Sequence, residues 1–484
     1  MTSGVCAKLL TYKPRFFDDV THLCVDEVHE RDVDTDVALA LARERLRRAR
    51  LAPRVVLLSA TLDAALLRRY FGAAAPLDIP GRRHDLARVC VEDLGTDRDP
   101  LLAGAWLPPR VARCRDDLAR RTRELDAGGV VPRVVNAQQL ELAVWLARAL
   151  AAGTDGGFAA RAVLIFVAGL SDIGAVADKF EALRGGNVDY VLVPVHGELP
   201  FEAQRDALLC EGLAPSGRRV VRILVATNAA ESSLTLPDVD AVVDCGSRKL
   251  PTYDASCDRV LLRHAWASQA TAKQRAGRTG RVAFGACYHL VSSNLLNRCR
   301  AYDAPHVQAA PLDQVVLGLR GSLPHSLAAP LLREFPSPPS EAQIADAFGL
   351  LEKRGLIEVR AAPPARALPT DVIDAYDGTP LTPAGRLAAS LPVDLRLSRL
   401  VAFGAAVGRL EDATLLAAGL GQQAPPWATP LPLPHLYADA QDYLVAARGA
   451  LLGKRHFDSG DACGPCLLYT SDAADDTPCV DLGG

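Results

Sequence analysis

Short apolar runs that end in polar residues recur near the start of the chain. Two of them read THLCVDEVHE (residues 21–30) and PRVVLLSATLD (residues 53–63), and VALALARERLRRAR (residues 37–50) between them repeats Leu, Ala and Arg at helical spacing. Strand, helix and strand in this order are typical of a doubly wound parallel sheet, which binds ligands at the carboxyl ends of its strands. The pattern therefore predicts an α/β lobe with a site at these polar strand ends.

A second set of apolar runs predicts a second α/β lobe. The runs are RAVLIFVAGLSDI (residues 161–173), DYVLVPVHGELP (residues 189–200) and RRVVRILVATNAAESSLTLPDVDAVVDCG (residues 218–246), and each strand finishes on Gly, His, Thr or Asn. Two lobes that face each other with their polar strand ends would form a cleft.

Beyond about residue 290 the pattern becomes mainly helical. SEAQIADAFGLLEKRGLIEV (residues 340–359) has Leu and Ile at helical spacing, ends its helix at Gly355 and continues into a short strand, which is typical of a winged-helix module. The expected fold class is α/β, with two doubly wound parallel-sheet lobes, the first incomplete, followed by a mainly helical region. The expected division is 1–94 for the partial first lobe, 95–132 for a linker or insertion rich in Arg, Asp and Pro, 133–290 for the second lobe, 291–380 for the winged-helix-like part and 381–465 for an incomplete helical bundle.

Composition and charge exclude several classes of protein. At 484 residues the chain is too long for one ordinary core, and it is 49% hydrophobic and 23% charged. It has no run of about 18 apolar residues and no basic segment followed by an apolar one at the N-terminus, so we expect an intracellular protein without a membrane span or signal peptide. Because the formal net charge is only -3, any nucleic-acid binding must come from local patches.

Twelve cysteines are scattered along the chain, which favours reduced thiols over a disulfide framework. CGPC (residues 463–466) has the spacing of a thioredoxin-type redox motif, but such a motif needs a strand before it and a helix after it, and LLYTSDAADDTPCVDLGG follows. The tail over residues 466–484 resembles a translated sequencing-library adaptor. We therefore expect this tail to be an artefact and the cysteine pair to have no redox role.

The segment VDEVHE (residues 25–30) puts two carboxylates at the end of a predicted strand. Burial and mutual repulsion would make such a pair costly, and a divalent cation would relieve that cost. Asp26 could hold Mg²⁺ through water, Glu27 could orient and deprotonate a water molecule, and His29 could relay contacts to the other lobe. An acidic helix start, which the helix dipole favours, is the alternative interpretation.

The segment KQRAGRTGR (residues 273–281) packs four positive charges and two glycines into nine residues. A solvated basic face is one interpretation of such a run. The other is a phosphate site, because a guanidinium group offers a planar fork to phosphate oxygens and glycines allow the tight turns that let side chains three apart converge.

Four motifs in this order resemble those of the DEAH-box and RNA helicase A group of superfamily 2 helicases: DEVHERDVDTD, LLSATLD, NAAESSLTLPDVD and QRAGRTGR. IPGRRH (residues 79–84) and LTPAGRLAA (residues 381–389) extend the resemblance to about Gly408. The resemblance implies an ATP-dependent RNA helicase or translocase with ATP and Mg²⁺ between two RecA-like lobes, followed by winged-helix and helical-bundle regions. It also implies sequence-independent contacts to single-stranded RNA, and a DNA-directed helicase remains an alternative.

The resemblance assigns roles to residues of this chain. The catalytic set is Asp26, Glu27, His29, Ser59, Thr61, Gln274, Arg278 and Arg281, and Asp26 and Glu27 would also hold Mg²⁺. The ATP-binding set is Ser233, Thr235, Gly277, Arg278 and Arg281, while Pro237 stands where many members have an Asp that contacts the ribose. The nucleic-acid-binding set is Thr2, Gly4, His196 and Thr227, and SRKLPTYD (residues 247–254) could start a strand-separating hairpin. Capping of the next helix would explain Ser59 or Asp63 equally well.

The phosphate-cradling loop G-x-x-x-x-G-K-[ST] does not occur in the sequence. The family places this loop well before a TSGV-like segment, and Met1 stands immediately before TSGV (residues 2–5). We therefore expect a fragment that begins inside the first lobe, lacks the family's C-terminal OB-fold module and is inactive alone. The alternative is a non-catalytic RNA-binding or scaffold relative, against which the intact DEVH and QRAGRTGR segments argue.

Overall fold

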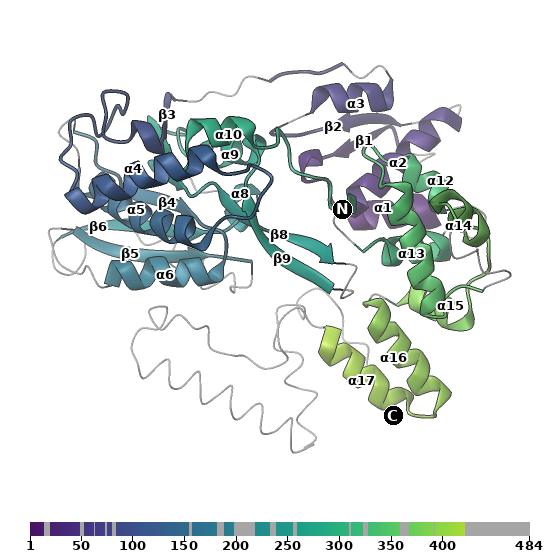
Figure 1. The fold of residues 1–484 in the computed structure, drawn as a ribbon. Helices are drawn as coiled ribbons and strands as arrows, with labels where there is room; N and C mark the ends of the chain where they lie inside the picture. The colour runs from purple at the N-terminus through teal and green to yellow at the C-terminus, as the bar shows by residue number, and fades with distance from the viewer. Residues whose placement is uncertain are drawn as a thin grey trace.

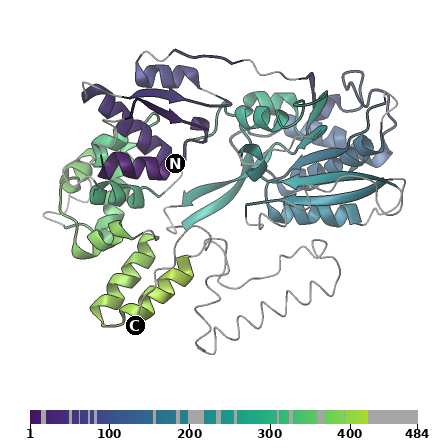
Figure 2. The same ribbon diagram turned by 180° about the vertical axis from the view of Figure 1, so that it is seen from behind.

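The structure, a computed structural model, describes residues 1–13, 20–48, 53–61, 63–72, 75–79, 84–153, 157–181, 188–197, 218–232, 239–254, 259–308, 311–322, 328–358, 367–391 and 393–421. These stretches form two halves, one around a large sheet and one in which the N-terminal elements lie beside the C-terminal helices (Figures 1 and 2). None of the described helices is long and apolar enough to cross a membrane.

One half is built around a six-stranded parallel sheet. Its strand order is β3-β10-β7-β4-β6-β5. The strands are β3 (Leu86–Cys90), β4 (Ala162–Phe166), β5 (Val188–Val195), β6 (Arg219–Ala226), β7 (Ala241–Asp244) and β10 (Gly285–His289). All residues of β4, β7 and β10 are buried, as expected where a near-continuous apolar run is covered on both faces.

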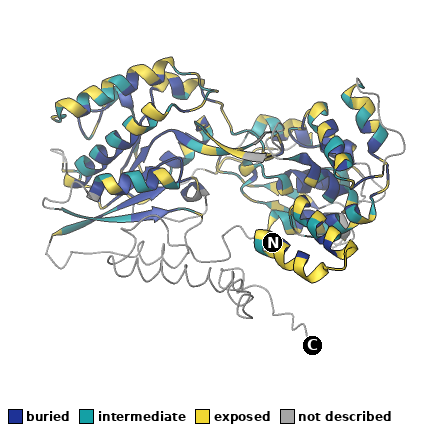
Figure 3. Ribbon diagram, turned by 60° about the horizontal axis from the view of Figure 1, so that its bottom comes forward, coloured by how far each residue is buried: buried dark blue, intermediate teal, exposed yellow. Residues whose placement is uncertain are grey.

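Helices cover both faces of this sheet. Helices α4 (Pro109–Glu124), α5 (Arg133–Ala152), α6 (Leu170–Glu181) and α10 (Ser293–Arg298) contribute to one hydrophobic cluster, which contains Leu118, Leu146, Phe180 and Leu295. Helices α8 (Ala229–Ser232) and α9 (Gln269–Ala276) reach the other face through Ala230 and Ala276. Figure 3 shows the buried strands between helices whose outer surfaces are exposed.

The bounds of this lobe differ from the expected division. Strand β3 lies within the segment assigned to the first lobe, yet it pairs in parallel with β10 from Leu86 to Cys90. The 3₁₀ helix η3 (Val91–Asp93) and helix α4 follow and pack into the same core through Val91, Leu94 and Leu118. The lobe around the six-stranded sheet therefore begins at about Leu86. Residues 95–132 are not a linker, because they include helix α4 of this lobe.

The first lobe contains a two-stranded parallel sheet of β1 (His22–Val25) and β2 (Arg54–Leu57). Helix α1 (Ser3–Tyr12) precedes it, α2 (Val33–Arg48) connects the strands, and α3 (Ala64–Phe71) follows. The order strand, helix, strand agrees with the sequence pattern. Both strands alternate between exposed and half-buried residues, so neither is fully buried. Within the described residues of this lobe, β1 and β2 pair only with each other.

The C-terminal helices share a hydrophobic core with the first lobe. They are α11 (Leu312–Ser322), α12 (Ala328–Arg333), α13 (Glu341–Lys353), α14 (Pro369–Tyr376), α15 (Pro383–Ser390), α16 (Leu395–Ala406) and α17 (Leu410–Gly421). Ala7 and Leu41 of α1 and α2 belong to the same cluster as Leu332 and Phe348. Helices α1 and α2 of the first lobe therefore share one core with helices α11 to α16, while β1, β2 and α3 pack around a second, smaller cluster that contains Leu67 and Tyr70.

Helix α13 ends as the sequence predicts. It ends at Lys353, and Gly355 has a φ of 68°, which favours glycine. The expected short strand is represented by an isolated antiparallel bridge between Ile357 and Leu381, and residues 359–366 lie outside the described residues.

A long pair of strands extends from the six-stranded-sheet lobe. Strands β8 (Ser247–Asp254) and β9 (Arg259–Trp266) pair antiparallel over their whole length and lie between β7 and α9 in the chain. Figure 1 shows the hairpin leaving the six-stranded-sheet lobe towards the other half. The expected start of a hairpin at residues 247–254 is thus a strand of one.

Candidate functional site

Parallel pairing aligns the ends of β1 and β2. The amide of Leu58 donates to the carbonyl of Val25 at 2.9 Å, and the amide of Val28 donates to the carbonyl of Leu58 at 3.2 Å. The loops that leave the two strands, which carry the acidic segment and the SAT segment, therefore lie side by side, as the polar strand ends predict.

The two carboxylates lie in a tight turn after β1. Glu27 has a φ of 51°, a left-handed conformation that is uncommon for a residue with a side chain, and its amide donates to Oδ1 of Asp26 at 2.8 Å. Asp26 is exposed and Glu27 half-buried, so the burial cost assumed for this pair is absent. The η2 turn (Val28–Glu30) that follows has one 3₁₀ turn only, and no carboxylate caps it. The carboxylates of Asp26 and Glu27 therefore make no capping hydrogen bond to this turn.

His29 connects the acidic turn to the SAT segment. Its Nδ1 lies 3.1 Å from Oγ of Ser59 and 3.3 Å from Oε2 of Glu27. The hydroxyl of Ser59 donates to the carbonyl of Thr61 at 3.1 Å. Asp63, not Ser59, caps α3, because its carboxylate accepts from the amide of Leu66 at 2.9 Å. The capping alternative therefore holds for Asp63, while Ser59 belongs to the polar network.

Helix α9 closes this network from the other lobe. The side-chain amide of Gln274 donates to Oγ1 of Thr61 at 3.3 Å and is hydrogen-bonded to Nε2 of His29. Since the Gln274 side-chain nitrogen can only donate, Nε2 of His29 accepts in this contact and Nδ1 carries the proton that faces Ser59 and Glu27. The two lobes thus meet through a ring of hydrogen bonds between predicted site residues.

Arginines from the end of α9 face the acidic turn. A cavity of about 90 Å³ is lined by Glu27, His29, Ala60, Thr61, Glu231, Lys273, Gln274, Gly277, Arg278 and Arg281. Burial lowers the pKa of Arg278, as does the positive charge of Arg281, while Glu27 and Glu231 act in the opposite direction. Arg278 also donates to the carbonyl of Glu231, whereas Arg281 is exposed. Acidic and basic walls therefore oppose each other across a small space.

This arrangement suits a phosphate group together with a hydrated cation. Arginines can bind phosphate oxygens as planar forks. Within the described residues no group of three or more His, Cys, Asp or Glu side chains could hold a metal by itself. Mg²⁺, however, commonly uses one or two carboxylates plus water and substrate phosphates, which the exposed Asp26 and the neighbouring Glu27 can provide.

The spacing of the basic motif does not distinguish Arg275 from Arg278 and Arg281. The side chain of Arg275 is fully buried, and it donates to Oε1 of Glu231 at 2.9 and 2.7 Å and to Oδ1 of Asp244 at 2.7 Å. It also donates to the carbonyl of Ser247 at 3.1 Å, and Asp244 accepts from Nδ1 of His289 at 3.0 Å. Of the three arginines in the motif, Arg275 therefore stabilises the interior of the lobe and does not face the cleft. The burial of its side chain shows this difference, whereas the spacing of the motif does not.

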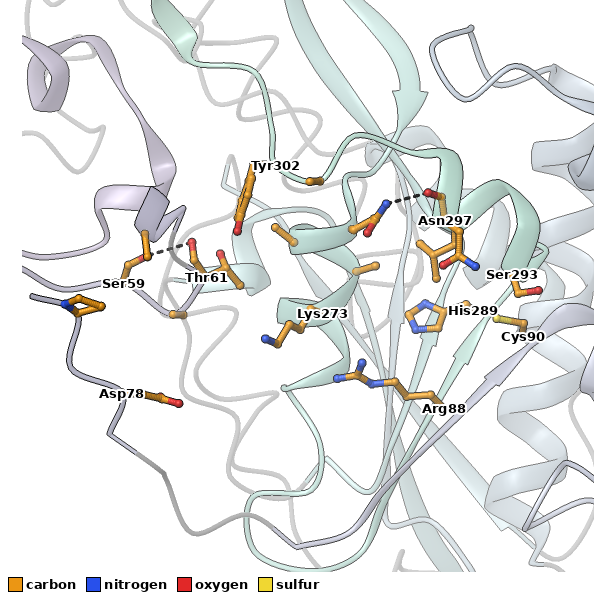
Figure 4. A pocket seen from close by; sticks show the side chains of 18 of the residues that line it. Ser59, Thr61, Asp78, Arg88, Cys90, Lys273, His289, Ser293, Asn297 and Tyr302 are labelled. Carbon is orange, nitrogen blue, oxygen red and sulfur yellow. Dashed lines mark hydrogen bonds between the residues drawn. The ribbon is translucent and has the colours of Figure 1, made fainter. Parts of the chain in front are cut away.

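A second, larger cavity of about 720 Å³ adjoins the first along α9. Figure 4 shows Ser59 and Thr61 on one side of it and Lys273, Arg88 and His289 on the other. The two cavities share Ala60, Thr61 and Lys273. The cleft between the lobes therefore continues past the SAT segment.

The remaining predicted ATP contacts are only partly visible. Ser233, Thr235 and Pro237 lie outside the described residues. Gly277 follows the last residue of α9, where its amide donates to the carbonyl of Lys273, and it lines the small cavity.

The predicted nucleic-acid contacts lie in both halves. His196 and Thr227 follow the adjacent strands β5 and β6, and the amide of Thr227 donates to the carbonyl of Val195 at 3.2 Å. Thr2 caps α1 by accepting from the amide of Val5, and Gly4 lies against α2, where an added Cβ would be 2.6 Å from Oδ2 of Asp34. The structure thus brings His196 and Thr227 together, and gives Thr2 and Gly4 a packing role at the start of a helix.

Comparisons with known proteins give a consistent result. Residues 159–283 match the family described as the helicase conserved C-terminal domain. The chain is 28% identical over 447 residues to the DExH-box ATP-dependent RNA helicase DExH1 of Arabidopsis thaliana, which covers 88% of this chain and 42% of that protein. It is 31% identical over 414 residues to the probable ATP-dependent RNA helicase spindle-E of Drosophila sechellia, covering 83% and 27% of the two chains.

Solved structures agree in fold. A crystal structure of the Escherichia coli DEAH/RHA helicase HrpB matches with a TM-score of 0.60 at 24% identity, over 87% of this chain and 44% of that one. A second HrpB structure, described as a DExH-box NTPase, matches with a TM-score of 0.62 at 22% identity, over 93% and 46%. The chain spans less than half of the length of each of these relatives.

Proposed function

The chain belongs to the DEAH/DExH-box RNA helicase family of superfamily 2, and from this premise we propose that the natural protein carrying this sequence is an ATP-dependent RNA helicase. It hydrolyses ATP in the cleft between two RecA-like lobes and uses the lobe movement to unwind or remodel RNA. The region that follows is winged-helix-like and then a helical bundle.

One observation carries the proposal: a hydrogen-bonded ring connects the lobes at the opposed acidic and basic walls. Gln274 reaches Thr61 and His29 from the second lobe, and His29 continues to Ser59 and Glu27 in the first. A ligand that binds both walls must alter the hydrogen bonds of this ring, because Glu27, His29, Thr61 and Gln274 also line the small cavity. The ring therefore supplies a physical link between nucleotide state and lobe position.

The acidic wall binds the cation and activates the attacking water. Asp26 and Glu27 are the residues that would hold Mg²⁺, which when bound offsets phosphate charge and orients phosphate oxygens. Glu27 orients the attacking water and accepts its proton, while His29 fixes the Glu27 carboxylate through the 3.3 Å contact. A carboxylate that is held in place loses less entropy when it acts.

The basic wall stabilises charge on the transferred group. Arg278 and Arg281 offer guanidinium groups to the γ-phosphate, where negative charge is distributed over the equatorial oxygens in the transition state. Gln274 contacts the γ-phosphate while it is hydrogen-bonded to Thr61. Ser233, Thr235 and Gly277 complete the nucleotide contacts from the second lobe.

The RNA contacts come from both lobes. His196 and Thr227 contact the phosphate-sugar backbone at the ends of β5 and β6, and Thr2 and Gly4 do so at the start of α1. Hydroxyls and backbone amides at such positions bind phosphates without reading bases, which makes the affinity largely independent of sequence.

The test compares Glu27→Gln with wild type in the full-length natural protein. We expect Glu27→Gln to reduce single-stranded-RNA-stimulated phosphate release by at least about 100-fold, within the range for loss of a positioned base, and to leave RNA binding within about twofold because the contact residues are unchanged. Glu124→Gln, an exposed glutamate at the end of α4, is the matched control.

Other outcomes separate the alternatives. RNA binding by wild type without any ATP hydrolysis would favour a non-catalytic RNA-binding or scaffold protein. Equal stimulation by single-stranded DNA and RNA, with unwinding of DNA duplexes, would indicate a DNA-directed helicase. Hydrolysis that survives in Glu27→Gln would refute the role given to this carboxylate.

A further inference from the structure

Helix α9 faces two different parts of the molecule. Its C-terminal half bears Gln274, which reaches the first lobe, and its N-terminal half bears the buried Thr271. Ser268 caps the helix by accepting from the amide of Thr271 at 3.1 Å. Thr271 thus occupies a fixed position at the end of the helix that is remote from Arg278 and Arg281.

A polar cluster connects this end of α9 to the base of the hairpin. The hydroxyl of Thr271 donates to Oδ2 of Asp303 at 2.8 Å, and Arg248, the second residue of β8, donates to the same oxygen. Arg248 also lies 3.4 Å from Oγ1 of Thr271. The side chains of Arg248 and Asp303 are 13% and 36% exposed, so the charged contact is only partly screened by water.

The segment that carries Asp303 leads to the first lobe. Its residues are fastened to the first turn of α9, since the amides of Gln269 and Ala270 donate to the carbonyls of Arg300 and Ala301 at 2.9 and 3.0 Å. Three residues after Asp303, the amide of His306 donates to the carbonyl of Arg31 at 3.1 Å. Asp303 therefore lies where α9, the hairpin base and a connection to the first lobe meet.

We propose that Asp303 is a positioning residue that couples movement between the lobes to the hairpin β8–β9. The proposal rests on the proposed helicase function. When the first lobe moves against Gln274, helix α9 shifts as a rigid element, and Thr271 and Asp303 transmit the shift to Arg248. The hairpin extends from this base towards the other half of the molecule (Figure 1), so a small displacement at the base becomes a larger one at its far end.

A second link explains why one charged cluster can steer the hairpin. Arg275, one turn further along α9, donates to the carbonyl of Ser247, the first residue of β8. This buried contact fixes the position of the strand start. The contact of Arg248 with Asp303 holds β8 at a second, neighbouring residue. Together the two contacts fix the direction in which the strand leaves the lobe.

The first experiment measures backbone amide hydrogen exchange in this chain and needs no helicase activity. We expect Asp303→Asn and Thr271→Val each to raise exchange by about fivefold in residues 247–254 and 259–266, the scale expected for loss of a partly buried ion pair in the first variant and of a buried hydrogen bond in the second. Asp116→Asn, which removes a surface Asp–Arg pair on α4 of the same lobe, is the matched control and should leave the hairpin unchanged. Unchanged hairpin exchange in both test variants would overturn the proposal, as would a rise spread evenly over the lobe in both.

The second experiment measures base pairs separated per ATP hydrolysed by the full-length natural protein. We expect Asp303→Asn to lower this ratio about fivefold while RNA-stimulated ATP turnover stays within about twofold, because the residue is remote from the cleft arginines. Arg248→Ala and Asp303→Ala should be non-additive in the double variant if they act through each other. A parallel loss of ATP turnover and unwinding, or additive effects of the two substitutions, would refute the proposed coupling through Asp303. A wild type that neither hydrolyses ATP nor unwinds RNA would refute the proposed helicase function. In that case the hydrogen-exchange result would still show whether Asp303 positions the hairpin.

Discussion

The side-chain amide of Gln274 in the second lobe donates to the hydroxyl of Thr61 in the first lobe across 3.3 Å. The same amide contacts His29, which lies 3.3 Å from the Glu27 carboxylate. Gln274 of the basic motif thus contacts the acidic motif directly and reaches its Glu27 carboxylate through His29. Whatever moves one lobe relative to the other changes the surroundings of Glu27.

Replacing Gln274 should therefore impair hydrolysis without unfolding the protein. We expect Gln274→Ala to lower RNA-stimulated ATP turnover by roughly 10- to 100-fold, because His29 and Thr61 lose the group that holds them and small misplacements in a site can cost about 100-fold. Steady-state phosphate release in the full-length natural protein measures the effect, with the thermal midpoint as a check of folding. Gln308→Ala, an exposed glutamine in the 3₁₀ helix η4 (His306–Gln308), is the control, and turnover within twofold of wild type would contradict the expectation.

Arg281 provides a test of the basic wall because its side chain is exposed and little stability depends on it. We expect Arg281→Ala to lower kcat for ATP hydrolysis by about 10³-fold, as for other arginines that stabilise a transferred phosphoryl group. Arg281→Lys should recover little, since an ammonium group lacks the planar fork. Single-turnover hydrolysis reports the chemical step, and Arg113→Ala on the exposed face of α4 is the control. Near-normal hydrolysis by Arg281→Lys would show that charge alone suffices.

The sequence predicts the order of the elements better than their membership of a lobe. Strand β3 lies within residues 1–94, the division expected for the first lobe, yet it pairs with β10 as an edge strand of the second and has only Val89 fully buried. Helix α4 lies in residues 95–132, whose many charged residues favour a linker and obscure the apolar positions of the helix. Its buried residues are Val111, Leu118, Ala119 and Thr122, which follow helical spacing.

The site is predictable in part for a similar reason. Local spacing reveals the strand-end carboxylates and the arginine run, because each lies within one short segment. Pairs such as Arg275 with Glu231, or Thr271 with Asp303, join residues that are far apart in the chain. Their partners depend on how the sheet and the hairpin pack, which no single segment encodes.

The chain of 484 residues by itself should show no ATP hydrolysis above background. The printed sequence contains no G-x-x-x-x-G-K-[ST], so the amides, lysine and hydroxyl that such a loop supplies to the phosphates and Mg²⁺ are not provided by it. Phosphate release with and without single-stranded RNA measures this. A turnover of about 1 s⁻¹ or more, typical of enzymes, would show that other residues of this chain bind the phosphates.

The buried cluster around Asp244 should make the stability of the second lobe depend on pH. Burial alone lowers the pKa of His289, but Cys287 and the Asp244 carboxylate outweigh it and raise the pKa to about 10. Because this value lies above the unfolded value of about 6.5, the protonated His289 stabilises the fold fully below about pH 6.5 and the stabilisation is lost as the pH rises towards 10.

His289→Gln tests this dependence in a form that needs no enzymatic activity. We expect wild type to lose stability, on the order of several kcal/mol, between pH 6.5 and 10, and His289→Gln to be less stable at pH 7 but to change less over that interval. Urea unfolding followed by circular dichroism at several pH values measures both slopes. His22→Gln, at an exposed histidine of β1, should keep the wild-type slope. Equal slopes for wild type and His289→Gln would mean that the charge of His289 does not stabilise the buried Asp244 carboxylate.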